Sequence, residues 1–281
     1  MASAMEFGVS LPSRGPLARP DIVLKIAAKA EALRYASVFV SDHIVLPTSS
    51  ARSVYPYSPT GQLPGGANQD YLEPLSLLAH LAQATTKVRL GTSVLVVPYR
   101  NPVTTAKTLA TIDVLSRGRV ILGAGVGWLR EEFEAVSAPP FAERGRVTDE
   151  YLSLMRAMWT KDPVSFAGRF YTVRDVHALP KPVQRGGIPI WIGGQAGRDP
   201  RTIALTFRTP MEVRGAREKS PGGDRPLFQG TAAEVIDDVR RYQALGVSHI
   251  VFDPVRPDVN AALASLERFA HDVRPKVRAS R

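Results

Sequence analysis

Short hydrophobic runs of strand length alternate with longer, helically periodic segments along most of the 281 residues. Runs of β-branched and aromatic residues that end in turn-forming residues favour strands, and seven such runs are present. The predicted strands are Glu6–Leu11, Ser37–Val40, Lys87–Val97, Arg119–Gly123, Ile188–Ile192, Thr202–Arg208 and His249–Asp253.

Apolar residues at three- and four-residue spacing predict helices between these strands. The alternation of strand and helix predicts a parallel sheet, and the expected fold class is an α/β barrel in one domain over residues 1–281. Two segments fall outside the pattern: residues 44–71, rich in Pro and Gly, predict a lid-like loop, and residues 163–180 a small hairpin insertion. The predicted helices are Ile22–Arg34, Glu73–Ala84, Pro102–Leu115, Arg144–Trp159, Thr231–Leu245 and Asn260–Val273.

Polar and glycine residues end four of the predicted strands. In α/β barrels the carboxyl ends of the strands carry the active site, so this placement predicts an enzyme that holds a flat cofactor there. The four segments are Ser41-Asp42-His43, Gly91-Thr92-Ser93-Val94, Gly123-Ala124-Gly125-Val126-Gly127-Trp128 and Gly193-Gly194-Gln195.

His43 is the candidate catalytic residue, since an imidazole ordinarily exchanges its proton at about pH 6.5, near working conditions. Asp42 beside it can orient the imidazole or bind polar groups of a cofactor. The same residues can instead form a simple turn in which Asp42 is a cap. Three alternating glycines, Gly123, Gly125 and Gly127, predict either close approach of a ligand to the backbone or a tight turn between strand and helix.

Charged residues away from the strand ends are expected to be structural. We expect Glu131 and Glu132 to face solvent or to cap a helix, and Asp113 and Arg119 to form a salt link that fixes a turn. Neither the histidines nor the carboxylates have the spacing of metal ligands, so no metal is expected.

The composition narrows the classes of partner. The chain has 36 Lys and Arg against 26 Asp and Glu, a net charge of +10. Such an excess attracts anionic partners or reflects an arginine-rich composition, but the basic residues are not interleaved with aromatic ones, so no nucleic-acid partner is expected. The absence of cysteine excludes disulfides and thiolate metal sites. Without a secretory signal or an apolar run of ~18 residues, we expect a cytoplasmic protein with no membrane partner.

Several segments of the chain form a recognisable set: FGVSLP, VSDH, LGTSVLVVPYRNP, AKTLATIDVLSRGRVILGAGVGW with EEF after it, the hairpin and PKPVQ before IPIWIGG, AGRDP, and GTAAEVIDDVRRYQALGVSHIVFD. Through these segments most of the chain resembles the bacterial luciferase-like superfamily, and within it the branch that uses the deazaflavin coenzyme F420. The stretch from Asn101 to Phe133 is the most specific part of this resemblance.

The resemblance implies a TIM-type (β/α)8 barrel, a homodimer, and coenzyme F420 at the carboxyl face with His43 beside its reactive carbon. It also implies a non-proline cis peptide in the strand that holds Ser93-Val94. Trp128 is the candidate substrate contact. The candidate cofactor-binding residues are Asp42, Thr92, Ser93, Val94, Gly125, Val126, Gly127, Gly193, Gly194 and Gln195.

The chain departs from the family pattern in two places. Trp128 stands where sugar-phosphate dehydrogenases of the family carry a glutamate acid, which disfavours that reaction. After Gly194 the barrel is expected to be shorter by about one βα unit, with a connection at residues 195–201 in place of the dozen or more residues that a crossover needs. The missing helix end would remove an anion site, and the candidates to replace it are Arg198, Arg201 and Arg208.

The predicted function is an oxidoreductase that transfers a hydride between coenzyme F420 and a small organic substrate. The residues around Trp128 and in the 44–71 loop favour a hydrophobic or cyclic substrate. Two alternatives stay open: a monooxygenase that depends on flavin mononucleotide (FMN), and a non-catalytic barrel remnant that binds a cofactor or anion.

Overall fold

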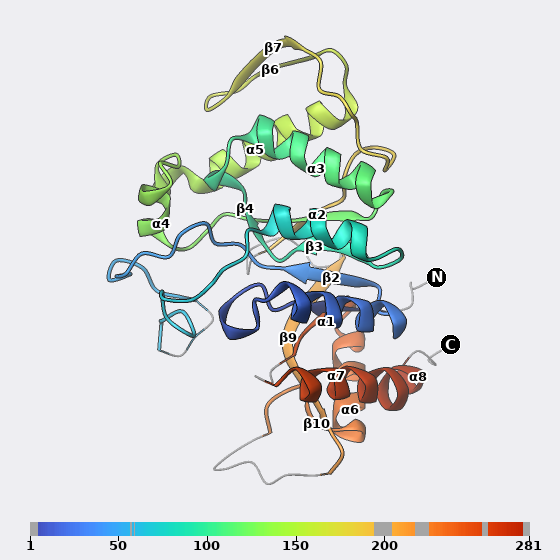
Figure 1. Cartoon of the computed structure of the whole chain (residues 1–281). Helices are drawn as coiled ribbons and strands as arrows, with labels where there is room; N and C mark the ends of the chain where they lie inside the picture. Colours follow the sequence, from blue (N-terminus) through green and yellow to red (C-terminus); the bar gives the residue numbers. More distant parts are fainter. Residues whose placement is uncertain are drawn as a thin grey trace. The chain divides into compact units, whose positions relative to one another are not determined.

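The computed structural model describes residues 5–56, 58, 60–193, 204–216, 225–254 and 258–277 (Figure 1). The chain divides into two compact units. The first comprises Met1–Pro12, Arg19–Phe39 and Gln195–Arg281, and the second comprises Ser13–Ala18 and Val40–Gly194. The predicted catalytic, cofactor-binding and substrate-binding residues, except Gln195, belong to the second unit.

The first unit is built on a parallel sheet. Its strands β1 (Glu6–Ser10), β2 (Ser37–Val40), β9 (Leu205–Arg214), β10 (Gln229–Thr231) and β11 (Val247–Pro254) pair in the order β10, β9, β11, β1, β2. Its helices are α1 (Pro20–Ala32), α6 (Ala232–Ala244) and α7 (Val259–Arg268), which continues through a π-helical turn, Phe269–Val273, into α8 (Arg274–Val277). The buried rings of Phe7, Phe252 and Phe269 pack together in its core.

Strand β5 (Val120–Gly125) is the centre of the second unit. It pairs in parallel with β3 (Arg89–Thr92) near its beginning and with β4 (Leu95–Val96) and β8 (Ile190–Ile192) near its end. Helices α2 (Pro74–Ala84), α3 (Pro102–Ser116) and α5 (Arg144–Thr160) lie side by side in this unit (Figure 1). The carboxyl ends of β4, β5 and β8 therefore lie together.

Shorter elements complete the second unit. The 3-10 turns are Gly15–Leu17, Val97–Tyr99 and Phe141–Glu143, and α4 (Arg130–Ala135) follows β5. Strands β6 (Val164–Ala167) and β7 (Thr172–Val176) form an antiparallel hairpin where the sequence predicts one. Among the described residues from 45 to 70 there is no helix or strand, and residues 195–201, the expected short connection, lie outside the described part of the chain.

The structure corrects several element boundaries. The predicted strand Lys87–Val97 is two strands, β3 and β4, separated at Ser93-Val94, where the peptide bond is cis as the resemblance implies. Strand β9 continues to Arg214, six residues beyond the predicted end at Arg208. The sequence pattern ended the strand too early because Pro210 lies within it, and proline argues against a strand. Strand β10 and helix α4 are too short for a periodic signal, so the sequence did not predict them.

Local capping follows the sequence closely. Thr231 and Glu234, three residues apart in the sequence, form a capping box at the start of α6. The side chain of Asn101 accepts hydrogen bonds from the amides of Val103 and Thr104, and Pro102 occupies the first turn of α3. These interactions satisfy amide groups that a helix start leaves without partners.

The side chain of Val94 occupies space that glycines leave at the ends of β5 and β8. A Cβ atom added to Gly125 would overlap Cγ2 of Val94, and one added to Gly193 would overlap its Cγ1. Gly127 has a φ of +82°, and a Cβ there would crowd Phe133 and Val96. These glycines are therefore required by packing within the protein, in addition to any approach of a ligand.

We expect Gly125→Ala to destabilise the protein by about 1–3 kcal/mol, because the added methyl group overpacks against Val94. Urea unfolding measures this change. Gly145→Ala in α5 is the matched control, since no atom lies within 4 Å of the added carbon and alanine favours a helix. Val94→Ala should restore part of the stability of the Gly125→Ala variant. Equal effects of the alanines at 125 and 145 would contradict this packing argument.

Candidate functional site

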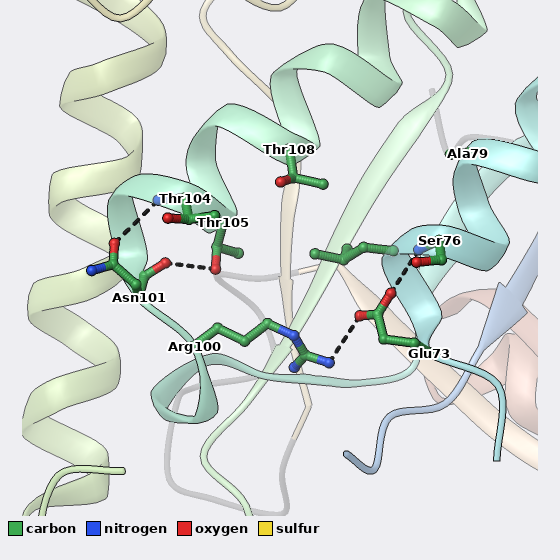
Figure 2. Close-up of a pocket in the computed structure, with 9 residues that line it drawn as sticks. Glu73, Ser76, Ala79, Arg100, Asn101, Thr104, Thr105 and Thr108 are labelled. Carbon is green, nitrogen blue, oxygen red and sulfur yellow. Dashed lines mark hydrogen bonds and ion pairs between the residues drawn. The ribbon is translucent and has the colours of Figure 1, made fainter. Parts of the chain in front are cut away.

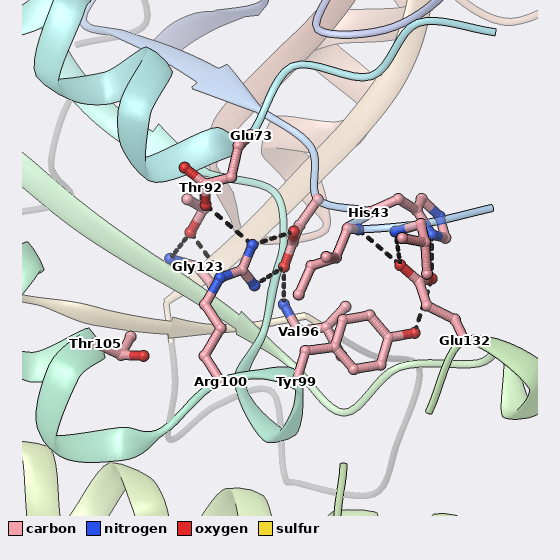
Figure 3. Close-up of polar contacts among 12 residues, drawn as sticks. His43, Glu73, Thr92, Val96, Tyr99, Arg100, Thr105, Gly123 and Glu132 are labelled. Carbon is pink, nitrogen blue, oxygen red and sulfur yellow. Dashed lines mark hydrogen bonds and ion pairs between the residues drawn. The ribbon is translucent and has the colours of Figure 1, made fainter. Parts of the chain in front are cut away.

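The imidazole of His43 is held by a carboxylate from a distant part of the sequence. His43 follows β2 and is only 7% exposed, and its Nδ1 lies 2.5 Å from Oε2 of Glu132 in α4 (Figure 3). Its Nε2 makes no hydrogen bond within the described residues. The rings of Tyr71 and Trp128 lie edge-on to the imidazole, with centroids 5.2 and 6.1 Å away. The site therefore presents one free imidazole nitrogen beside aromatic side chains.

Glu132 is fully buried and accepts several hydrogen bonds. Its Oε2 accepts from the Tyr99 hydroxyl at 3.0 Å, and its Oε1 accepts from the amides of Ile44 at 2.7 Å and Val45 at 3.2 Å. Burial, together with the nearby charge of Glu132, raises the pKa of Tyr99, so this hydroxyl stays protonated and donates. Hydrogen bonds from fixed donors make a buried carboxylate tolerable.

The expectation that Glu132 faces solvent or caps a helix is wrong. Leu129, the residue just before α4, and Glu132 and Phe133 within it are all buried, and their spacing of three and four residues places them on one side of this helical turn. The apolar residues on either side of Glu132 were a signal in the sequence that this carboxylate points inward. Glu131 instead faces the loop that follows His43.

Asp42 belongs to a second charged cluster next to the first. Its two carboxylate oxygens accept from the Arg100 guanidinium at 2.7 and 2.8 Å, and Oδ2 also accepts from the Val96 amide at 2.8 Å (Figure 3). Arg100 bonds Glu73 as well, at 3.0 Å. Glu132, not Asp42, is thus the residue that contacts His43, while Asp42 holds β4 and Arg100 in place.

Electrostatics in this cluster are set by burial and by Arg100. Burial raises the pKa of Asp42, and the hydrogen bonds and charge of Arg100 oppose that rise. For Arg100, burial lowers the pKa, but the attraction of Asp42 and Glu73 is stronger and raises it overall. The short bidentate contact favours the ion pair over two neutral groups.

The remaining predicted residues of β3, β4 and β5 lie at the strand ends. The Thr92 hydroxyl donates to the Gly123 carbonyl at 2.9 Å and accepts from the Gly123 amide at 3.1 Å, so it joins β3 to β5. The Ser93 amide donates to the Val40 carbonyl at 2.7 Å. Val126 is 39% exposed just beyond β5. Gly194 and Gln195 lie outside the described residues.

Helix α4 also holds the first part of the 44–71 loop. Glu131 accepts from the Arg52 amide at 2.9 Å and the Ser53 hydroxyl at 2.6 Å. Arg52 forms a bidentate ion pair with Glu134. The ring of Tyr55 packs edge-on against Trp128, with 5.1 Å between centroids. The loop is therefore docked beside the imidazole, at the place where the sequence predicts a lid.

A groove of about 560 Å³ opens where α2 and α3 begin (Figure 2). It shares Glu73 and Arg100 with the charged cluster, but His43 does not line it. The residues that line it are Glu73, Leu75, Ser76, Ala79, Arg100, Asn101, Thr104, Thr105 and Thr108.

Several predictions concerned residues away from His43. Arg208 in the first unit bonds the Asp253 carboxylate and the Ser10 hydroxyl, and this acidic partner argues against a phosphate-binding role. Arg198 and Arg201 lie outside the described residues. Asp113 has a structural role, but it accepts from the amides of Val183 and Val120. The expected salt link with Arg119 is wrong, since the Arg119 guanidinium donates to the carbonyls of Ala82, Thr85 and Val88.

No group of three or more His, Asp or Glu side chains in the described ranges is placed to hold a metal ion. No helix in this part of the chain is long and apolar enough to cross a membrane.

Parallel strands joined by helices place the chain in the α/β class, with the buried imidazole of His43 just after the end of a strand. The sequence pattern of the luciferase-like monooxygenases matches residues 5–213. The chain therefore belongs to this luciferase-like family of oxidoreductases.

Relatives in the family use different cofactors. An uncharacterised protein of Mycobacterium bovis is 30% identical over 87% of this chain and 91% of its own length. An F420-dependent glucose-6-phosphate dehydrogenase of Amycolatopsis mediterranei is 34% identical over 75% of this chain and 58% of its own. An FMNH2-dependent dimethylsulfone monooxygenase of Pseudomonas putida is 36% identical over 48% of this chain and 38% of its own.

Solved structures confirm the predicted fold class, an α/β barrel of the luciferase-like type. The monooxygenase RslO1 from Streptomyces bottropensis has a TM-score of 0.75 at 18% identity, covering 96% of this chain and 99% of its own. An F420-dependent secondary alcohol dehydrogenase has a TM-score of 0.74 at 19% identity, covering 98% and 99%.

We expect Asp42→Ala to destabilise the protein by about 3–5 kcal/mol, because it leaves the mostly buried Arg100 without its bidentate partner. Asp21→Ala is the control, since its ion pair with Arg19 is exposed and should contribute no more than about 1 kcal/mol. Guanidinium unfolding of both variants measures the difference. A loss of less than about 1 kcal/mol in Asp42→Ala would contradict the role given to this pair.

Proposed function

We propose that this protein is an oxidoreductase that transfers a hydride between coenzyme F420 and a small organic substrate. The observation that carries the proposal is the imidazole of His43, fixed through Nδ1 with Nε2 free, at the carboxyl end of a strand. The similarity to an F420-dependent dehydrogenase over 75% of the chain supports the choice of cofactor.

The residues at the strand ends fit a flat, largely apolar ring. Val94 packs between Gly125 and Gly193, and Val126 and Ile192 are exposed at the ends of β5 and β8, two strands that pair directly. This combination offers an apolar surface in the same unit as the His43 imidazole. We therefore assign Thr92, Ser93, Val94 and the glycines beside them to the cofactor site.

The protein's own groups would bind the substrate and move a proton. The deazaflavin, when bound, supplies the carbon that gives or receives the hydride. His43 Nε2 would take the proton from a substrate hydroxyl when the substrate is oxidised, or return it to the substrate oxygen in the reverse direction. Trp128, Tyr55 and Tyr71 would contact a hydrophobic or cyclic substrate and exclude water.

The second candidate is an FMN-dependent monooxygenase. The FMNH2-dependent relative of Pseudomonas putida supports it over about half of the chain, and a structural neighbour with a TM-score of 0.71 contains FMN. The same apolar surface accommodates either ring system, so the two cofactors are distinguished by direct binding.

On the family resemblance we also propose that the protein forms a homodimer. Light scattering of the purified protein tests this oligomeric state.

Titration of the purified protein with coenzyme F420 and separately with FMN, followed by ligand fluorescence, tests the choice of cofactor. We expect saturable binding of the deazaflavin and weaker binding of FMN. The reverse preference would move the assignment to the monooxygenase, and binding of neither would favour a barrel without catalysis.

We expect His43→Ala to lower turnover by about 10²–10⁴-fold while leaving the dissociation constant of the cofactor almost unchanged, because it removes a proton-transfer group. Turnover is measured by the fluorescence of oxidised F420 in a screen of small cyclic alcohols and ketones. His80→Ala is the control, since His80 lies exposed on α2. Unchanged turnover in His43→Ala would show that another group transfers the proton.

A further inference from the structure

The carboxylate of Glu132 connects the imidazole to two other parts of the second unit. It touches His43 after β2, the first two residues of the 44–71 loop, and Tyr99 in the 3-10 turn that precedes α3. Because Glu132 is fully buried, water does not replace these partners. Each oxygen of the carboxylate is committed to particular donors.

We propose that Glu132 is a positioning residue that fixes the proton of the neutral imidazole on Nδ1 and so leaves the lone pair of Nε2 facing the reaction. The inference rests on the proposed role of His43, but the state of the imidazole is measurable without any cofactor. In the catalytic triads of serine hydrolases a carboxylate has this relation to a histidine, and loss of its charge with retained geometry lowers kcat by about 10⁴.

The donors around Glu132 determine where the proton lies. An ionised carboxylate accepts hydrogen bonds and donates none. The amides of Ile44 and Val45 can only donate to Oε1, and Tyr99 donates to Oε2. The hydrogen in the 2.5 Å contact must therefore come from the ring, which places it on Nδ1. Nε2 of the neutral ring is then an acceptor.

The same contacts join the imidazole to the docked loop. Glu132 receives the amides of residues 44 and 45 on one oxygen and Nδ1 of His43 on the other. A movement of the beginning of the loop would therefore remove donors from the carboxylate that orients the imidazole. Ordering of the loop and the orientation of the proton-transfer group are parts of one hydrogen-bond network.

Glu132→Gln makes the proposal sharply testable. The amide oxygen must remain with the two backbone donors of Ile44 and Val45, so its NH2 group faces His43 Nδ1. Nδ1 must then accept, and the proton moves to Nε2. We expect the variant to fold and its His43 to show the opposite tautomer from the wild type.

The measurement is the pair of ring ¹⁵N chemical shifts of His43 at a pH where the ring is neutral, in protein labelled at histidine. The His43→Ala variant assigns the signals among the 5 histidines. Wild type should show a protonated Nδ1, and Glu132→Gln a protonated Nε2. Tyr99→Phe, which removes a donor to Glu132 without touching His43, should retain the wild-type tautomer.

Turnover in the proposed reaction should fall by at least roughly 10-fold in Glu132→Gln, the loss typical for a partner of a metal-ligating histidine, and by up to about 10⁴-fold if the relation matches that of a catalytic triad, with cofactor binding unchanged. A wild-type spectrum with the proton on Nε2 would overturn the proposal even if the variant does not fold. An unchanged tautomer in Glu132→Gln would overturn it as well. Absence of F420 binding with the expected tautomers would count against the proposed function alone.

Discussion

The carboxylate of Glu132 is the interaction on which the local arrangement of this site depends. A buried charge is costly unless it is surrounded by hydrogen-bond donors, and here the donors come from segments far apart in the sequence. The beginning of the 44–71 loop, the Tyr99 hydroxyl and the His43 imidazole all converge on α4. The hydrogen bonds to this one carboxylate therefore hold the segments that surround the imidazole next to one another.

Two adjacent residues serve two different clusters. His43 turns toward Glu132, while Asp42 turns toward Arg100 and the Val96 amide. The two side chains reach different partners, which explains why Asp42 does not orient its neighbour. Asp42 instead ties β4 to Arg100, and this fixes the strand that follows the cis peptide bond.

Glycine at the ends of β5 and β8 has a structural explanation that a search for ligand-binding motifs misses. Gly125 and Gly193 leave room for the methyl groups of Val94, so a side chain from the β3–β4 segment can reach across two neighbouring strand ends. The Val94 side chain therefore forms part of the proposed cofactor surface, and it fits there because residues 125 and 193 have no Cβ atom. The same two glycines thus allow both the packing of Val94 and the proposed binding of the cofactor.

The sequence by itself determined the order of the strands and helices, the location of His43 and the family. Strand runs such as Ser37–Val40 and the capping box at Thr231 depend on neighbours in the chain, and local patterns record such neighbours. Tertiary structure alone decided that Glu132 rather than Asp42 meets His43, 89 residues away in the sequence, and that Arg208 meets Asp253. Pairing of distant charges depends on which helix face is buried and where a loop docks, and a single sequence does not encode those distances locally.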